Sequence, residues 1–164
     1  MLIEGKCAGR DITLDTNILV HSVSPKDGRQ SDALALLDWL RNCPSQTRWV
    51  LDDQGKAAPD PMTSVLYKEY RDRLQPQSAP LILLGAFLQR GRVTFAPRPD
   101  AQLRKKLRLL VPRNIADQAV LGAATASQSQ FLVSNDFSDF PDRVRKAARK
   151  DLGVTVVSGQ EAVA

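Results

Sequence analysis

Cysteine and histidine are scarce in this chain, and their scarcity removes several kinds of site. The 164 residues include two cysteines, Cys7 and Cys43, and one histidine, His21. Two cysteines exclude a disulfide framework and a cysteine-rich zinc site, and one histidine excludes a site built from several. A Ser–His–Asp or Cys–His catalytic group would have to use His21, which no nucleophile motif accompanies. Catalytic chemistry must therefore come from other side chains.

Long apolar runs are also missing. The longest, at residues 81–88, is far shorter than the roughly 20 residues that cross a bilayer, and charged residues follow it. The first residues carry no apolar segment of the kind found in secretion signals. No glycine-rich phosphate loop occurs either. We expect a cytoplasmic protein without a membrane partner, and no nucleotide site of the phosphate-loop kind.

What the chain has is the composition of a globular domain with a basic surface. Hydrophobic residues make up 43% and charged residues 25%, enough for a packed core. The 23 basic and 18 acidic residues give a net charge of +5. A basic surface attracts polyanions such as nucleic acid. That attraction becomes informative where the acidic residues gather in one place.

Short apolar segments alternate with helical patterns along the whole chain. Thr16 and Asn17 are expected in a turn or cap, and Leu34, Leu37 and Leu40 on the inward face of a helix. Strands are predicted at 11–15, 47–52, 93–95, 131–134 and 154–157, and helices from 18 and at 29–42, 62–74, 80–90, 101–110, 115–127 and 142–151. This alternation predicts one α/β domain over residues 1–164, a three-layer α/β/α sandwich with a central, mostly parallel sheet.

Two acidic residues stand directly after predicted strands. Asp15 ends the first strand, and Asp136 lies just beyond the strand at 131–134. Ligands of parallel α/β sheets gather outside the carboxyl ends of the strands. The two carboxylates are therefore expected at a binding edge.

Four motifs in order resemble the PIN-domain family of metal-dependent ribonucleases. They are Leu-Asp-Thr-Asn-Ile-Leu around Asp15, Glu69 within a mid-chain helix, Asp117 leading an alanine-rich helix, and Ser-Asn-Asp around Asp136 followed by Asp139. The resemblance covers roughly residues 11 to 157. It implies catalytic Asp15, Glu69, Asp117 and Asp136, with Asp139 as a further metal ligand.

The resemblance also implies partners. Mg²⁺ or Mn²⁺ would be the cofactor and RNA the substrate. Because many PIN relatives are toxins of toxin–antitoxin pairs, an antitoxin protein and a second copy of the chain are the implied protein partners. On this interpretation Asp15→Asn abolishes Mn²⁺-dependent cleavage of single-stranded RNA and leaves the fold intact.

Physical chemistry supports a cation among these acids. Mg²⁺ and Mn²⁺ prefer carboxylate oxygens, and converging carboxylates without a cation repel one another. Thr16, Asn17 and Ser134 are expected to hold the carboxylates in place through hydrogen bonds. Basic residues on two helices are expected to bind the nucleic acid: Arg104, Lys105, Lys106, Arg108, Arg145 and Arg149.

Each acid also has a structural alternative. These are helix capping by Asp15, pairing of Glu69 with Arg73, interaction of Asp117 with a helix dipole, an Asx-turn at Asp136, and capping by Asp139 of the helix after Pro141. The sequence assigns no role to Asp52 and Asp53, which read equally as an acidic turn. The basic helices read equally as solvated faces.

Other functions compete with the nuclease. The main alternative is a PIN-like module that binds RNA or a protein without cutting. Phosphatases of the haloacid-dehalogenase type carry a second aspartate two residues after the first, where this chain has Asn17. A flavodoxin-like binding module remains compatible with the architecture alone.

Overall fold

Five parallel strands form the centre of the protein. The structure is a computed structural model that describes residues 1–55, 58 and 60–164. Within these residues the strand order is β3-β2-β1-β4-β5, and every neighbouring pair is parallel. The strands are β1 (Asp11–Leu14), β2 (Arg48–Asp52), β3 (Val93–Ala96), β4 (Phe131–Val133) and β5 (Thr155–Val157). The predicted α/β class and parallel sheet are confirmed.

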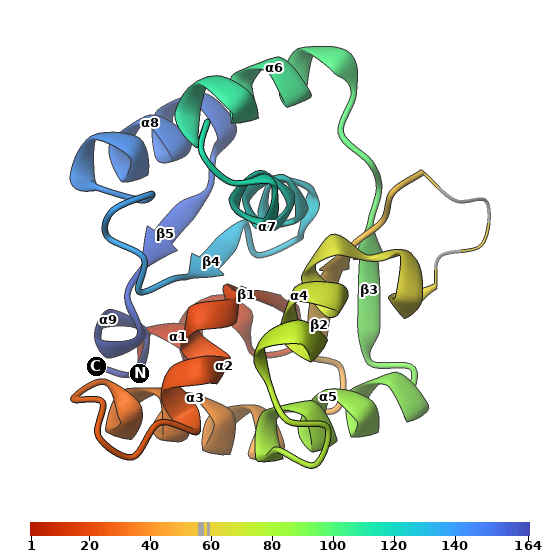
Figure 1. The fold of residues 1–164 in the computed structure, drawn as a ribbon, viewed down its shortest axis with the longest axis vertical. Helices are drawn as coiled ribbons and strands as arrows, with labels where there is room; N and C mark the ends of the chain where they lie inside the picture. Colours follow the sequence, from red (N-terminus) through yellow and green to blue (C-terminus); the bar gives the residue numbers. More distant parts are fainter. Residues whose placement is uncertain (56–57, 59) are drawn as a thin grey trace.

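Helices cover both faces of this sheet and complete a three-layer sandwich. Right-handed crossovers place α2 to α5 on one face and α6 to α8 on the other, because the chain reverses direction along the sheet after β3. Figure 1 shows α6, α7 and α8 above the sheet, and α2, α3 and α5 below it. The helices are α1 (Leu2–Cys7), α2 (Thr16–Ser22), α3 (Gln30–Asn42), α4 (Val65–Arg73) after a 3₁₀ turn η1 (Pro61–Thr63), α5 (Ala79–Gln89), α6 (Ala101–Leu110), α7 (Ile115–Ala126), α8 (Asp142–Leu152) and α9 (Gly159–Val163).

The central strands β1 and β4 are buried throughout, and β2 from Trp49 on, as expected of a covered parallel sheet, whereas the edge strand β3 is half-buried. Trp49 of β2 is fully buried and packs against Tyr70 of α4, with ring centroids 6.2 Å apart. Its other neighbour is Phe87 of α5, edge-on at 5.8 Å. This aromatic cluster joins α4 and α5 to β2, which fixes the helix that carries Glu69.

The small residues of α7 allow close packing. A methyl group at Gly122 would stand 3.1 Å from Leu107 of α6 and 3.1 Å from Pro99. Glycine therefore lets α6 approach α7 closely. This contact holds α7, whose first turn carries Asp117, between α6 and the sheet.

Two local predictions require correction. Thr16 and Asn17 belong to α2 itself, which begins directly after Asp15. Leu34 is 46% exposed and does not face the core. The buried stripe of α3 is instead Ala33, Leu36, Leu37 and Leu40. That stripe follows the i, i+3, i+4, i+7 spacing of a helix face, which the run through Leu34 does not complete.

The two terminal helices, α1 and α9, were not predicted. Both are short, and they contact each other on the same face as α3. Helices this short depend on tertiary packing for their stability, so a sequence pattern alone identifies them poorly. No helix in the described part of the chain is long and apolar enough to cross a membrane.

Candidate metal centre

The candidate site lies where the carboxyl ends of β1 and β4 meet. These strands are paired, with Leu14 opposite Val133, so the residues that follow them emerge side by side. Asp15 comes from β1 and Asp136 from β4. The third contribution comes from α7, where Asn114 accepts a hydrogen bond from Ala116 N at 2.8 Å and caps the helix start. Asp117 stands in this first turn.

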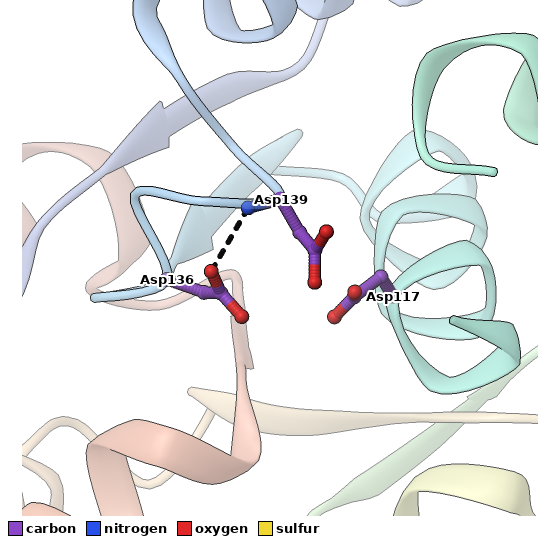
Figure 2. Close-up of side chains that lie close together, drawn as sticks. All are labelled: Asp117, Asp136 and Asp139. Carbon is purple, nitrogen blue, oxygen red and sulfur yellow. Dashed lines mark hydrogen bonds between the residues drawn. The ribbon is translucent and has the colours of Figure 1, made fainter. Parts of the chain in front are cut away.

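Three carboxylates converge here. Asp117, Asp136 and Asp139 each offer one oxygen atom, and these three oxygens lie within 4.8 Å of one another. Figure 2 shows Asp139 pointing toward Asp117 from the loop after β4. The helix-capping alternative for Asp139 is not observed, because Pro141 occupies the capping position of α8. We call these three residues the aspartate triad.

Asp117 is the most constrained member of the triad. Its side chain is 4% exposed, and its Oδ2 atom is buried without a hydrogen-bond partner. Burial, together with the charge of Asp15 and the carboxyls of Asp139 and Asp136, raises the pKa of this carboxyl to about 8. An unpartnered buried carboxylate oxygen is costly, and a cation would supply the missing interaction.

Asp136 is held by its own loop. Its Oδ1 atom accepts hydrogen bonds from Ser138 N at 3.0 Å, Ser138 Oγ at 2.8 Å and Asp139 N at 2.9 Å. Partial burial would raise the pKa of this carboxyl, but these hydrogen bonds lower it below its ordinary value. The Asx-turn alternative is therefore observed. It engages one oxygen and orients the carboxylate within the triad (Figure 2).

Asp15 lies beside the triad. It is 5% exposed, and its Oδ2 atom accepts from Ser134 Oγ at 2.6 Å and from Asn17 Nδ2 at 2.7 Å. Burial is the main cause that raises the pKa of Asp15; the Ser134 hydrogen bond opposes it, the charges of Glu69 and Asp136 add to it, and the resulting pKa is about 6. Asp15 occupies the capping position of α2 without a side-chain capping bond. It is therefore a buried carboxylate held mainly by other side chains.

Glu69 extends from α4 toward the start of α2, beside Asp15. Its Oε2 atom accepts a hydrogen bond from Thr16 Oγ1 at 2.7 Å, so the glutamate is tied to the start of α2. Like Asp15, it lies outside the close group of three oxygens, although its charge raises the pKa of Asp15. Of the five predicted acids, the fold brings three within ligand distance of one another and sets two beside them.

Asp52 has a role that the sequence did not reveal. It is 5% exposed and accepts hydrogen bonds from Ser64 Oγ at 2.6 Å, Leu66 N at 2.8 Å and Val65 N at 3.0 Å. The carboxylate of β2 thereby closes the amino end of α4, the helix that carries Glu69. Asp53 instead accepts from Gly55 N at 2.9 Å in the following turn. The signal for a cap was absent because 12 residues separate Asp52 from Ser64.

The predicted nucleic-acid-binding residues fall into two groups. Lys105, Lys106, Arg108 and Arg149 are exposed. Arg104 and Arg108 line a pocket of about 150 Å³ with Arg98, and the same pocket reaches Gln118, the neighbour of Asp117. Arg145 differs: its Nε atom donates to Phe140 O at 2.8 Å and its side chain is 13% exposed. It is engaged mainly with the protein.

Comparison with known proteins adds no relative. The chain matches no protein-family model, no curated protein and no solved structure.

Proposed function

We propose that this protein is a metal-dependent nuclease that hydrolyses phosphodiester bonds in RNA, with Mg²⁺ or Mn²⁺ held by the aspartate triad. The observation that carries the proposal is that Asp117, one of the three converging carboxylates, is buried and leaves its Oδ2 atom without a hydrogen-bond partner. Exposed acidic clusters are common, but a carboxylate with 4% exposure and an unpaired oxygen has a reason to bind a cation.

The donor set fits a hard divalent cation. Asp117, Asp136 and Asp139 supply oxygen ligands only, the kind that Mg²⁺ and Mn²⁺ prefer, and Asp136 and Asp139 are half-buried, so water has access. When bound, such a cation activates a water molecule and stabilises charge that develops on the phosphate. Asp15 and Glu69 add negative charge beside it. Thr16, Asn17 and Ser134 fix those two carboxylates through hydrogen bonds.

The proposed reaction is a hydrolysis. The oxygen of a water molecule bonds to phosphorus, one P–O bond to a ribose breaks, and the leaving oxygen gains the proton that the water loses. The carboxylates repel a polyanion, so the basic side chains near the site must offset that repulsion. The pocket formed by Arg98, Arg104 and Arg108 beside Gln118 is placed to do so.

The resemblance of four ordered motifs to PIN domains supports the same function. Pairing with an antitoxin and formation of a homodimer rest on that resemblance alone. The rival function, a PIN-like module that binds RNA or protein without cutting, lacks a reason to keep an unpaired buried carboxylate. It predicts neither metal-dependent cleavage nor metal-dependent stabilisation.

The test compares the wild type with Asp117→Asn, Asp15→Asn and Asp142→Asn on a single-stranded RNA in Mn²⁺. Asp142 is the matched control, since it is exposed and also lies in the first turn of a helix. We expect Asp117→Asn and Asp15→Asn to reduce kcat/KM on the order of 100-fold or more, and Asp142→Asn to retain activity.

A thermal melt in Mn²⁺ and in EDTA separates the two functions. Binding to the folded state raises the melting temperature as cation concentration rises. Wild-type cleavage that persists in excess EDTA, or full activity of Asp117→Asn, would overturn the proposal. Absence of both cleavage and a Mn²⁺-dependent melting shift would favour the binding module.

A further inference from the structure

Phe137 is an exposed aromatic residue on the loop that carries two members of the aspartate triad. Its side chain is 48% exposed, between Asp136 and Asp139 in the sequence. Every other aromatic side chain in the described part of the chain is buried or half-buried. The exposed ring beside the aspartate triad is therefore accessible to a ligand.

Arg145 and the hydrogen bonds of the loop hold the Phe137 ring in place. The Arg145 guanidinium lies 4.8 Å from the ring centroid of Phe137. Arg145 is itself fixed, because its Nε atom donates to Phe140 O at 2.8 Å and its guanidinium reaches Glu161 at 3.4 Å. The three hydrogen bonds to Asp136 Oδ1 fix the loop that carries the ring. The ring is therefore presented with little loss of freedom on binding, which favours affinity.

An open pocket of about 390 Å³ adjoins the ring. Asp136, Phe137 and Ser138 line it together with His21 and Arg29. The exposed Arg29 guanidinium lies over the ring, 5.4 Å from its centroid, and forms no ion pair within the described residues. The pocket therefore combines an aromatic face, a positive charge available to an anion, and a carboxylate of the triad.

The polar floor of the pocket is already hydrogen-bonded within the protein. Asn135 Oδ1 accepts from Gly159 N at 2.8 Å, and Asn135 Nδ2 lies 3.0 Å from His21 Nδ1. Asn17 Oδ1 accepts from Asn135 N at 2.9 Å. These groups offer few free donors or acceptors to the edge of a base. Recognition there must rely on stacking against the Phe137 ring and on the charge of Arg29, and both of these accept different bases.

We propose that this pocket binds one unpaired nucleobase of a single-stranded nucleic acid, next to the phosphate that is cleaved. The base displaces the Arg29 guanidinium from the ring and stacks on Phe137, and the displaced guanidinium contacts the adjoining backbone phosphate. Stacking requires a base free of its duplex neighbours, so single-stranded RNA is the substrate class. The position of the base relative to the cleaved bond rests on the proposed function; the binding itself does not.

The test measures binding without cleavage. Fluorescence anisotropy with a labelled single-stranded RNA in Ca²⁺ compares wild type with Phe137→Ala, Phe137→Leu and Phe137→Tyr. We expect Phe137→Ala and Phe137→Leu to weaken binding about 5- to 150-fold and Phe137→Tyr to retain it, because tyrosine keeps the ring. Ile82→Ala is the matched control, since Ile82 is 61% exposed on α5 and lines none of the pockets described here.

A second pair tests the phosphate contact. Arg29→Gln is expected to weaken binding and to lower its salt dependence, whereas Arg41→Gln is not, because Arg41 already pairs with Asp38 at 3.4 Å at the far end of α3. We expect replacement of the RNA by one with a single abasic position to weaken binding to wild type more than it weakens binding to Phe137→Ala.

The outcomes separate this proposal from the nuclease itself. Equal affinity of wild type, Phe137→Ala and Phe137→Leu would overturn the base-binding pocket even where the wild type cleaves RNA. Phe137-dependent binding by a protein that does not cleave would support the pocket and overturn the proposed function. A change in oligomeric state on Phe137→Ala, with RNA binding unaltered, would assign the ring to a protein interface and overturn the pocket.

Discussion

At the scale of single residues, burial decides the behaviour of the site. Asp117 and Asp15 are both nearly inaccessible to solvent, and the pKa of each lies above its ordinary value, at about 8 and about 6. Asp136, which is less buried and accepts three hydrogen bonds on one oxygen, has a lowered pKa. The same side-chain type therefore carries different charge at neutral pH, according to its surroundings.

These pKa shifts predict how stability depends on pH. A carboxyl whose pKa is raised by folding binds more protons in the folded state than in the unfolded state. The free energy of unfolding therefore falls as pH rises from the unfolded-state pKa to the folded-state pKa. For Asp117 that window runs from 3.8 to about 8. Within it, one such group costs about 1.4 kcal/mol of unfolding free energy per pH unit. Urea unfolding in EDTA at pH 5 to 8 measures this slope.

Asp117→Asn provides the comparison, because asparagine keeps the shape without the charge. We expect the variant to lose less stability than wild type between pH 5 and pH 8. Saturating Mn²⁺ should stabilise wild type more at pH 8 than at pH 5, since the cation binds the ionised carboxylates. Parallel pH profiles of wild type and Asp117→Asn in EDTA would contradict the assignment of the raised pKa to Asp117.

At the scale of elements, the amino end of α4 determines where Glu69 lies. Asp52 of β2 bonds to Ser64, Val65 and Leu66, so a strand end and a helix start are joined through one buried carboxylate. On the same helix, Tyr70 donates a hydrogen bond to Leu14 O, the residue before Asp15. Two contacts of α4 with the sheet therefore fix Glu69 relative to Asp15.

Loss of the Asp52 cap should be more harmful than loss of an ordinary cap. Asp52→Ala leaves buried donors of α4 unpaired, and we expect it to reduce the unfolding free energy by about 2–3 kcal/mol. The control is Asp100→Ala: Asp100 caps α6 through one bond to Leu103 N at 2.8 Å and is exposed, so its loss should cost about 1 kcal/mol. Urea titration of both variants checks the difference, and equal losses would contradict it.

At the scale of the whole molecule, charge is distributed unevenly. The acids gather where β1, β4 and the amino end of α7 meet, while α6 and α8 carry exposed basic residues. Figure 1 shows α6, α7 and α8 on the same face of the sheet. A net charge of +5 thus coexists with a locally acidic site. Such a distribution suits the proposed function, in which a polyanionic substrate approaches a cation held by the aspartate triad.

The basic surface predicts a salt dependence of RNA binding. Replacing one side chain that contacts a phosphate reduces the slope of log K against log salt by about 0.7 for a single strand. We expect Arg108→Gln to do so and to weaken binding of unrelated sequences equally. Arg41→Gln, which removes a paired arginine on the other face of the sheet, should leave the slope unchanged. Equal slopes for Arg108→Gln and wild type would show that Arg108 contacts no phosphate.

The sequence by itself determined the architecture. Alternation of apolar strands with helices is a local property, and it was enough to predict a parallel α/β sheet with Asp15 and Asp136 at strand ends. Local pattern was less accurate at the scale of a single helical turn. It placed Leu34 on the buried face of α3, although Leu34 is exposed, and it began α2 after Thr16 and Asn17, although the helix begins at Thr16. The short helices α1 and α9 were missed because packing rather than pattern stabilises them.

Only the tertiary structure decided which acids meet. The sequence grouped five, and the fold brings three of them within 4.8 Å, with Asp15 and Glu69 held beside them by Ser134 and Thr16. It also assigned Asp52 to the cap of α4 and placed Arg29 opposite Phe137. The reason is physical: contacts between residues far apart in the chain depend on strand order and helix packing, and the distance between two carboxylates depends on both.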